Sequence, residues 1–239
     1  MQKLVFVKDV GEVKIQKKYG IKNLRLSIHP KNGINISMPP HVSYDKAIEF
    51  LKSKQNWLTK KAAKFKHLND KDFIITNAYE FIGIKFNIKF YKQNKYTADY
   101  KNDVIEVFIP EFEDINSEQS QAFLRKAAEM ALKNKAHNYI PERVKFLAKQ
   151  NNFTFNSLKI GSSKTRWGSC SSSNNLIFSC YLMLMPKELI DFIIIHELCH
   201  TVHKNHGKEF HSLVDRICNG REKELTAKLK AQIHPLMYN

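Results

Sequence analysis

The chain has 239 residues, of which 43% are hydrophobic and 26% are charged, and it carries a net charge of +16 at pH 7. These proportions are ordinary for a soluble globular protein with one domain or two small ones, and the chain contains no internal repeat or low-complexity segment. No stretch approaches the ~20 consecutive apolar residues that a membrane helix needs, which argues against a membrane protein.

The first part of the chain is predicted to form strands followed by a helix. Alternation of apolar and polar residues indicates strands at residues 4–7, 13–16, 24–28 and 34–38, with a turn at residues 30–33. Pro39 and Pro40 end this pattern. Ser43 is the expected N-cap of a helix that continues to about residue 68.

A second strand-rich stretch and a long helix are predicted next. Residues 73–109 are strand-like, and residues 82–90 show the clearest alternation. An acidic loop at residues 110–116 follows. A helix is then expected over residues 117–150, with Pro141 as a point at which it could be interrupted.

A third strand region is predicted at residues 153–185, and it contains a hairpin. Residues 164–172 form the first part of this hairpin, and residues 176–182 are expected to be its returning strand. Pro186 then opens an apolar helix, as proline often does at a first helical turn.

That apolar helix carries the most informative motif of the chain, His-Glu-Leu-Cys-His at residues 196–200. Residues four apart on a helix lie on one face, so the imidazoles of His196 and His200 can bind a single metal ion. Glu197 projects to where a metal-bound water would lie. This pattern is typical of zinc hydrolases. The alternative is two partly buried histidines on an amphipathic helix, with Glu197 solvated.

A catalytic zinc site needs a third protein ligand, and several residues are candidates. His203 lies about 10 Å from His196 along a continuous helix, which is too far for a shared ion. His206 precedes Gly207, which we expect to adopt a left-handed conformation that ends the helix and folds His206 onto the metal. His206 is therefore the predicted third ligand. The alternatives that remain are His211, Asp215, Glu222 and Glu224.

The hairpin and the helix together resemble one protein family. Residues 166–170, Arg-Trp-Gly-Ser-Cys, followed by His-Glu-Leu-Cys-His, resemble the YgjP-like metallopeptidases, relatives of SprT-like and other zincin-fold proteins; residues 24–57 also resemble that family's N-terminal stretch. The resemblance implies that one Zn²⁺ per chain is bound by His196, His200 and His206, and that Glu197 is the catalytic base. Members often carry serine where Gly207 stands and tryptophan where His211 stands.

The resulting expectation is an α+β fold in which a mixed sheet packs on the metal-binding helix. Residues 111–239 would form a zincin-like catalytic core. Residues 1–110 would form a strand-rich region with one helix, either as a separate domain or as an extension of that core.

Residues 166–170 also contain a candidate for substrate binding. Arg166 is predicted to bind substrate, because a guanidinium can neutralise an oxyanion or a phosphate. The alternative for Arg166 is an ion pair with a nearby carboxylate. Trp167 is expected to be a core anchor and Gly168 a close-packing position. Cys170 and Cys199 are expected to be small packed residues.

These features predict a zinc metallopeptidase in which Glu197 activates a zinc-bound water to cleave a peptide or protein substrate. One alternative is a metal-dependent hydrolase of nucleoside triphosphates, and another is a non-enzymatic module with a structural zinc. The positive charge suits an anionic substrate, but the chain has no compact stripe of aromatic residues and arginines, so nucleic acid is not the expected partner.

A cytoplasmic location is expected. The N-terminus becomes charged too soon for a signal peptide. The four cysteines show no Cys-x-x-Cys spacing, and in a chain without an export signal they are expected to be reduced. The sequence does not predict an oligomeric state.

Overall fold

The computed structural model describes residues 2–7, 11–29, 33–59 and 74–232, together with His234 and Leu236. The chain divides into two compact units, which are described separately below. The first contains Met1–Phe73 and the last two residues, and the second contains Ile74–Met237.

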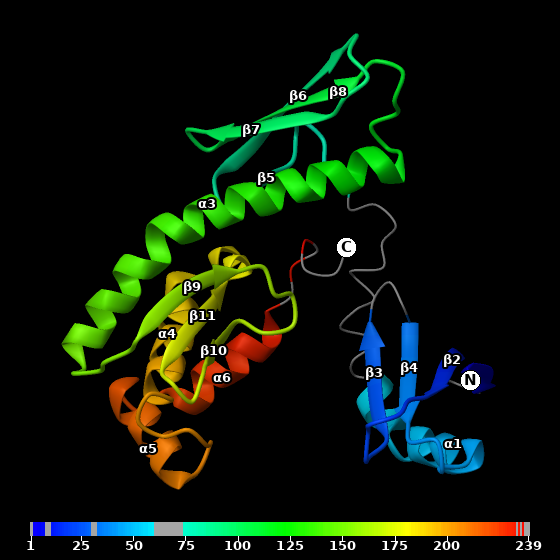
Figure 1. Cartoon of the computed structure of the whole chain (residues 1–239), viewed down its shortest axis with the longest axis vertical. Coiled ribbons are helices and arrows are strands. Elements are labelled where there is room, and N and C mark those ends of the chain that lie inside the picture. The colour runs from blue at the N-terminus through cyan, green and yellow to red at the C-terminus, as the bar shows by residue number, and fades with distance from the viewer. Residues whose placement is uncertain are drawn as a thin grey trace. The chain divides into compact units, whose positions relative to one another are not determined.

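The first unit contains a four-stranded sheet in the order β1-β2-β4-β3 (Figure 1). Its strands are β1 (Gln2–Val7), β2 (Gly11–Lys17), β3 (Arg25–His29) and β4 (Gly33–Met38). β2 and β4 are parallel, and the two outer pairs are antiparallel. All four predicted strands are therefore confirmed, whereas most of the expected turn before β4 lies outside the described residues.

A short helix, α1 (Tyr44–Ser53), packs on the apolar face of this sheet. Ser43 is its N-cap as predicted, because its hydroxyl accepts a hydrogen bond of 3.3 Å from the amide of Lys46. The helix ends earlier than expected, since Lys54 leaves helical geometry at φ −108° and ψ 11°. Residues 55–59 are helical again, and the remainder of the expected helix lies outside the described residues.

The second unit begins with another four-stranded sheet, in the order β5-β6-β8-β7. Its strands are β5 (Glu80–Phe81), β6 (Ile84–Tyr91), β7 (Thr97–Lys101) and β8 (Val104–Pro110). β6 and β8 are parallel neighbours, so the polypeptide crosses over between them by way of the edge strand β7.

The strand expected over residues 82–90 starts two residues later than predicted. Ile82 and Gly83 have φ values of 47° and 77°, and they form the two-residue turn between β5 and β6. Positive φ at both central positions gives a twist that matches that of antiparallel strands. The local turn geometry therefore prevails over the apolar character of Ile82.

One long helix, α3 (Glu118–Gln150), supports both halves of the second unit. The β5–β8 sheet lies along its N-terminal half, and the elements that follow α3 pack along its C-terminal half (Figure 1). Ser117 caps the helix by accepting a hydrogen bond from the amide of Ser120. Pro141 lies inside the helix without ending it, so the expected interruption does not occur.

A three-stranded mixed sheet follows α3, in the order β10-β11-β9. β9 (Ser157–Gly161) is parallel to β11 (Asn175–Ser179), and β10 (Gly168–Cys170) is antiparallel to it. The predicted hairpin is confirmed as β10 and β11. Its returning strand is shorter than expected, because Ser179 caps the 3-10 helix η1 (Cys180–Leu184) and so ends the extended segment.

Three helices complete the unit: α4 (Lys187–Cys199), α5 (Lys208–Ile217) and α6 (Glu222–Ala231). Pro186 is the N-cap of α4, which confirms that proline opens this helix. α4 contacts both α3 and β10. An ion pair fixes α4 to α3, since the guanidinium of Arg143 donates to both carboxylate oxygens of Asp191 at 2.7 and 2.6 Å.

The predicted α+β fold, with a mixed sheet packed beside α4, is therefore confirmed. By their contacts, β5–β8 belong with α3 in the second unit, whereas the sequence placed them in an N-terminal region of residues 1–110. The expected division into functional domains stays a prediction. In the part of the chain that the structure describes, no helix is both long and apolar enough to cross a membrane.

The side chain of Gln121 in α3 is hydrogen-bonded to the start of the second unit, and removal of this side chain should destabilise that unit. The Gln121 side chain accepts a hydrogen bond from the Ile75 amide at 2.8 Å and donates to the carbonyls of Ile75 and Ile115 at 3.0 and 2.9 Å. Because these groups are buried, Gln121→Ala should lower the free energy of unfolding by about 2–3 kcal/mol. Urea denaturation measures this, with exposed Gln119→Ala as the control. Equal stability of the two variants would contradict the assignment.

Candidate metal centre

The end of α4 places two histidines on one face of a buried helix. The residues that precede them, from Leu189 to Ile195, are almost all buried in the core of the second unit. His196 lies in the last turn of α4, and His200 is its C-cap with helical φ and ψ of −68° and −14°. The two side chains therefore project from successive turns in the same direction, as the spacing of four residues predicts.

The loop after α4 brings His206 back to these two residues. The Nε2 atom of His206 lies 3.1 Å from the Nε2 atom of His196 and 3.1 Å from that of His200. All three candidate ligand atoms lie within 4.8 Å of one another. Three ring nitrogens from two directions thus converge on one point, which is the arrangement that a tetrahedral metal ion requires for three of its ligands.

The backbone path that brings His206 to the other two histidines differs from the expected one. α4 ends at Cys199, with His200 as its C-cap, rather than at residue 207, and residues 201–206 reverse the chain. The expectation that Gly207 adopts a left-handed conformation is wrong, since its φ is −80° and its ψ is −178°. Gly207 is instead the N-cap of α5, a position that normally has extended backbone geometry.

His203 supports the cluster through its backbone. Its carbonyl accepts a hydrogen bond of 2.9 Å from Nδ1 of His200, so the proton of that imidazole is on Nδ1. The lone pair of His200 is therefore on Nε2, the nitrogen that faces His206. The His203 ring points elsewhere, with its Nδ1 atom 3.6 Å from a carboxylate oxygen of Glu209.

The alternative third ligands are engaged in other interactions. Nδ1 of His211 lies 2.6 Å from Oε1 of Glu222. A carboxylate oxygen of Asp215 accepts a hydrogen bond from the Glu222 amide, and Glu224 pairs with Arg221. None of these residues belongs to the group of three histidines.

Phe210 is a central residue of this site that the sequence analysis missed. Its side chain is fully buried, and its ring stacks on that of His200 with centroids 4.4 Å apart. The edges of His196 and His206 contact the same ring, at centroid distances of 4.9 and 4.8 Å. Phe210 thus fixes the orientations of all three imidazoles. Its spacing of four residues from His206 places it on the side of the cluster, but phenylalanine carries no ligand atom, so the ligand pattern alone does not indicate it.

Burial and mutual proximity keep the imidazoles of His196 and His200 uncharged. Burial, with a smaller effect of the neighbouring histidines, lowers the pKa of His196 to about 4. Burial also lowers the pKa of His200. A metal ion binds only the neutral imidazole, so both shifts favour the form that can act as a ligand.

The carboxylate of Glu197 is enclosed between α4 and β10. Only 7% of the residue is exposed, and burial raises its pKa to about 7, against a smaller lowering by the charge of Arg166. A Cβ atom at Gly168 would lie 2.7 Å from Cγ of Glu197 and 3.0 Å from its Oε1. Glycine is therefore required at position 168, because any side chain would collide with the glutamate.

The remaining residues that the sequence singled out lie in different environments. Arg166 is exposed, and in the described part of the chain its guanidinium forms no ion pair, so the alternative role as a partner of a carboxylate is not seen there. The Trp167 carbonyl accepts a hydrogen bond from the Ser179 amide at 2.9 Å. Cys199 is fully buried and burial raises its pKa to about 12, as expected of a packed thiol.

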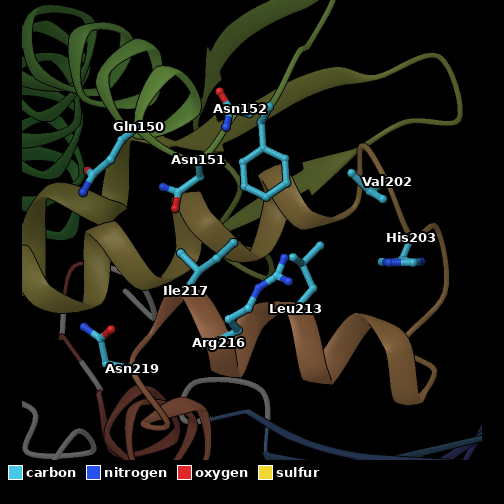
Figure 2. A pocket seen from close by; sticks show the side chains of 10 residues that line it. Gln150, Asn151, Asn152, Val202, His203, Leu213, Arg216, Ile217 and Asn219 are labelled. Carbon is cyan, nitrogen blue, oxygen red and sulfur yellow. The ribbon is translucent and has the colours of Figure 1, made fainter.

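The loop that carries His206 borders two other features. Nζ of Lys204 donates to the Ser171 carbonyl at 3.1 Å and also contacts Oδ1 of Asn174, which ties the loop to the turn after β10. On its other side lies a hollow of ≈ 670 Å³ between the loop, the end of α3 and α5. Figure 2 shows Val202 and His203 on one side of this hollow and Arg216 on α5.

Removal of His206 should greatly weaken metal binding. Purified wild-type protein should bind one zinc ion per chain, and His206→Ala should weaken zinc affinity by at least about a hundredfold because a direct ligand is lost. Isothermal titration calorimetry measures this, with circular dichroism as the check on folding. His211→Ala is the matched control, since this histidine is bonded to Glu222. Full zinc occupancy in His206→Ala would rule out the assignment.

Comparison with known proteins gives the family. The family model described as YgjP-like, metallopeptidase domain, matches residues 22–232. No curated protein matches the chain.

Two solved structures are similar to parts of the chain. The metallopeptidase zymogen abylysin of Pyrococcus abyssi is 17% identical, with a TM-score of 0.34 over 38% of this chain and 90% of that one. The metallopeptidase zymogen jannalysin of Methanocaldococcus jannaschii is 26% identical, with a TM-score of 0.31 over 38% of this chain and 96% of that one. Likeness at such TM-scores supports no inference about activity. The family match covers most of the chain, which therefore belongs to the YgjP-like metallopeptidase family, whose members depend on a divalent metal.

Proposed function

We propose that this protein is a zinc metallopeptidase that hydrolyses peptide bonds at the cluster formed by His196, His200 and His206, with Glu197 as the general base. The observation that carries the proposal is the convergence of three ring nitrogens beside the enclosed Glu197 carboxylate. Membership of a metallopeptidase family supports the same conclusion.

Zinc is the metal that fits these residues best. Imidazole nitrogens suit zinc, whereas magnesium and calcium prefer oxygen ligands. The group contains three protein ligands, the number found in catalytic zinc sites, while structural zinc sites have four. A bound zinc ion would polarise the scissile carbonyl and make the attacking water more acidic.

Glu197 performs the proton transfers in this proposal. It follows the ligand His196 directly in the helix, and its carboxylate is held by the close approach of Gly168 on β10. From this position it accepts a proton from the attacking water and then delivers it to the leaving amine. A single fixed carboxylate can serve both steps, because the water that gives up the proton and the amine that receives it lie next to each other.

The edge strand β10 offers a binding surface for an extended peptide. The amide of Ser179 donates to the Trp167 carbonyl and that of Ser171 donates to the Asn175 carbonyl, so alternate residues of this strand are bonded to β11. In an antiparallel pair, the residues between them direct their backbone groups to the opposite side. The amides and carbonyls of Gly168 and Cys170 thus face the free edge, where a substrate backbone can pair with them.

Hydrolysis of nucleoside triphosphates is the alternative that the same metal centre leaves open. The exposed cation Arg166 near Glu197 would also suit a phosphate group. Separate assays with casein fragments and with nucleotides discriminate between the two reactions. Cleavage of nucleotides alone would overturn the peptidase proposal.

Glu197→Gln should abolish turnover without loss of the metal. The substitution leaves the three histidines in place but removes the base, so kcat should fall by about a thousandfold. Cleavage of casein peptides measures the rate, and zinc content is determined on the same samples. Glu209→Gln, an exposed glutamate near His203, is the matched control and should retain activity. Full activity of Glu197→Gln would end the proposal.

Gly168→Ala tests whether catalysis depends on the position of the Glu197 side chain. The added methyl group would lie 2.7 Å from the side chain of Glu197 and should displace it, so kcat should fall by about tenfold to a hundredfold while zinc is retained. Gly161→Ala on β9 is the control, because its nearest neighbour would be Ile177 at an ordinary 3.7 Å. Similar rates for the two variants would show that the approach of β10 has no catalytic importance.

A further inference from the structure

A second hollow lies on the outer face of the three-stranded sheet. Its volume is ≈ 460 Å³, and its lining includes Lys159, Arg166, Ser169 and Ile177. Ile177 is 46% exposed, whereas its neighbours in β11, Leu176 and Phe178, are fully buried. Since successive residues of a strand point to opposite faces, Ile177 marks the face that is turned away from the core.

The register of the sheet places the other lining residues on this same face. Ser169 on β10 is directly opposite Ile177 on β11, and Ile177 is directly opposite Lys159 on β9. Residues directly opposite each other share a face. One row of side chains thus begins at the free edge of β10 and runs across the sheet. It consists of the hydroxyl of Ser169, the apolar side chain of Ile177 and the cation of Lys159.

The charge of this hollow is entirely positive. Lys159 and Arg166 both line it, and none of its lining residues is acidic. In the part of the chain that the structure describes, neither cation forms an ion pair. Other cations of the same unit do pair, such as Arg143 with Asp191 and Arg221 with Glu188. The hollow therefore presents two positive charges, of which that of Arg166 also acts on the nearby Glu197 carboxylate.

The free edge of β10 connects this hollow to the candidate active site. A peptide paired with Gly168 and Cys170 would direct every second side chain to the outer face of the sheet, over Ser169 and toward Ile177. Its other side chains would face the inner side, where Gly168 contacts Glu197. The hollow is thus in position to select one side chain of a bound substrate.

We propose that this hollow is a specificity site for an acidic side chain of the peptide substrate, recognised by Lys159 and Arg166. This inference rests on the proposed peptidase function. The side chain of a glutamate leans from the free edge over Ser169 toward Ile177, and the charges of Arg166 and Lys159 attract its carboxylate across the hollow. The exposed apolar floor distinguishes a peptide side chain from a bare phosphate, which has no apolar part to bury.

The test measures kcat/KM with matched peptides. Casein fragments that the zinc-loaded protein cleaves are identified by mass spectrometry, and each residue near the cleaved bond is then replaced in turn by glutamate or by glutamine. At one position, glutamate should be preferred by about fivefold, the size expected of an exposed ion pair. The preference should lie mainly in KM and should decrease with added salt.

Charge variants locate the source of the preference. Lys159→Met should reduce the preference, and Lys159→Glu should reverse it in favour of a lysine at the same substrate position. Lys126→Glu makes the same change of charge on the exposed face of α3, outside the hollow, and should leave the preference unchanged. A preference that changes equally in Lys126→Glu would reflect the overall charge and would overturn the inference.

The remaining outcomes separate this inference from the proposed function. Equal cleavage of glutamate and glutamine peptides at every position would overturn the specificity site but leave the peptidase proposal standing. Inhibition by inorganic phosphate that depends on Lys159, without any preference for glutamate, would mark a phosphate site instead. Failure of the zinc-loaded protein to cleave any peptide would overturn both proposals.

Discussion

Three imidazole nitrogens that face one another at about hydrogen-bonding distance form the constraint on which the site depends. Lone pairs on His196, His200 and His206 repel one another unless a cation or a shared proton lies between them. The low pKa of His196 keeps its ring neutral and so leaves it able to bind a cation, which would stabilise the cluster. Phe210 opposes the relaxation that would otherwise separate the rings, because it contacts all three of them.

The rest of the second unit holds this cluster in place. α3 supports η1, α4 and β9, and the bidentate pair between Arg143 and Asp191 fixes α4 against it. α4 in turn carries two of the three histidines, together with Glu197. Two of the histidines come from a buried helix and the third comes from a loop tied to the turn after β10, so the packing of the protein itself holds the three rings together. Such preorganisation reduces the cost of binding.

The sequence predicted those features of the site that depend on local geometry. The spacing of His196 and His200 follows from the helical repeat alone, and Pro186 correctly indicated where the helix begins. His206 does converge with the other two, but the backbone reason given for it, a left-handed Gly207, was wrong. The assignment of these residues as ligands stays a prediction that metal analysis can test.

Features that depend on contacts between distant segments could not be read from the sequence in the same way. Phe210 meets the histidines only because α5 packs against α4. Gly168 is a close-packing position as expected, but its neighbour, Glu197, is known only once β10 lies on α4. Strand ends were also misplaced where a turn or a cap decided them, as at Ile82 and Ser179. In each case the hydrophobic pattern continued past the residue at which the backbone changed direction.

The residues from Arg166 to Cys170 show how a short strand can serve two sides of one site. Gly168 faces inward, where its lack of a side chain admits Glu197, while Ser169 faces outward at the rim of the cationic hollow. Strand alternation makes this division unavoidable, since neighbouring residues must point to opposite faces. On the proposed function, the same three-residue strand would position the Glu197 carboxylate, pair with a substrate backbone and present one substrate side chain to Arg166. The requirement for these residue types in this order then follows from the geometry of a single edge strand.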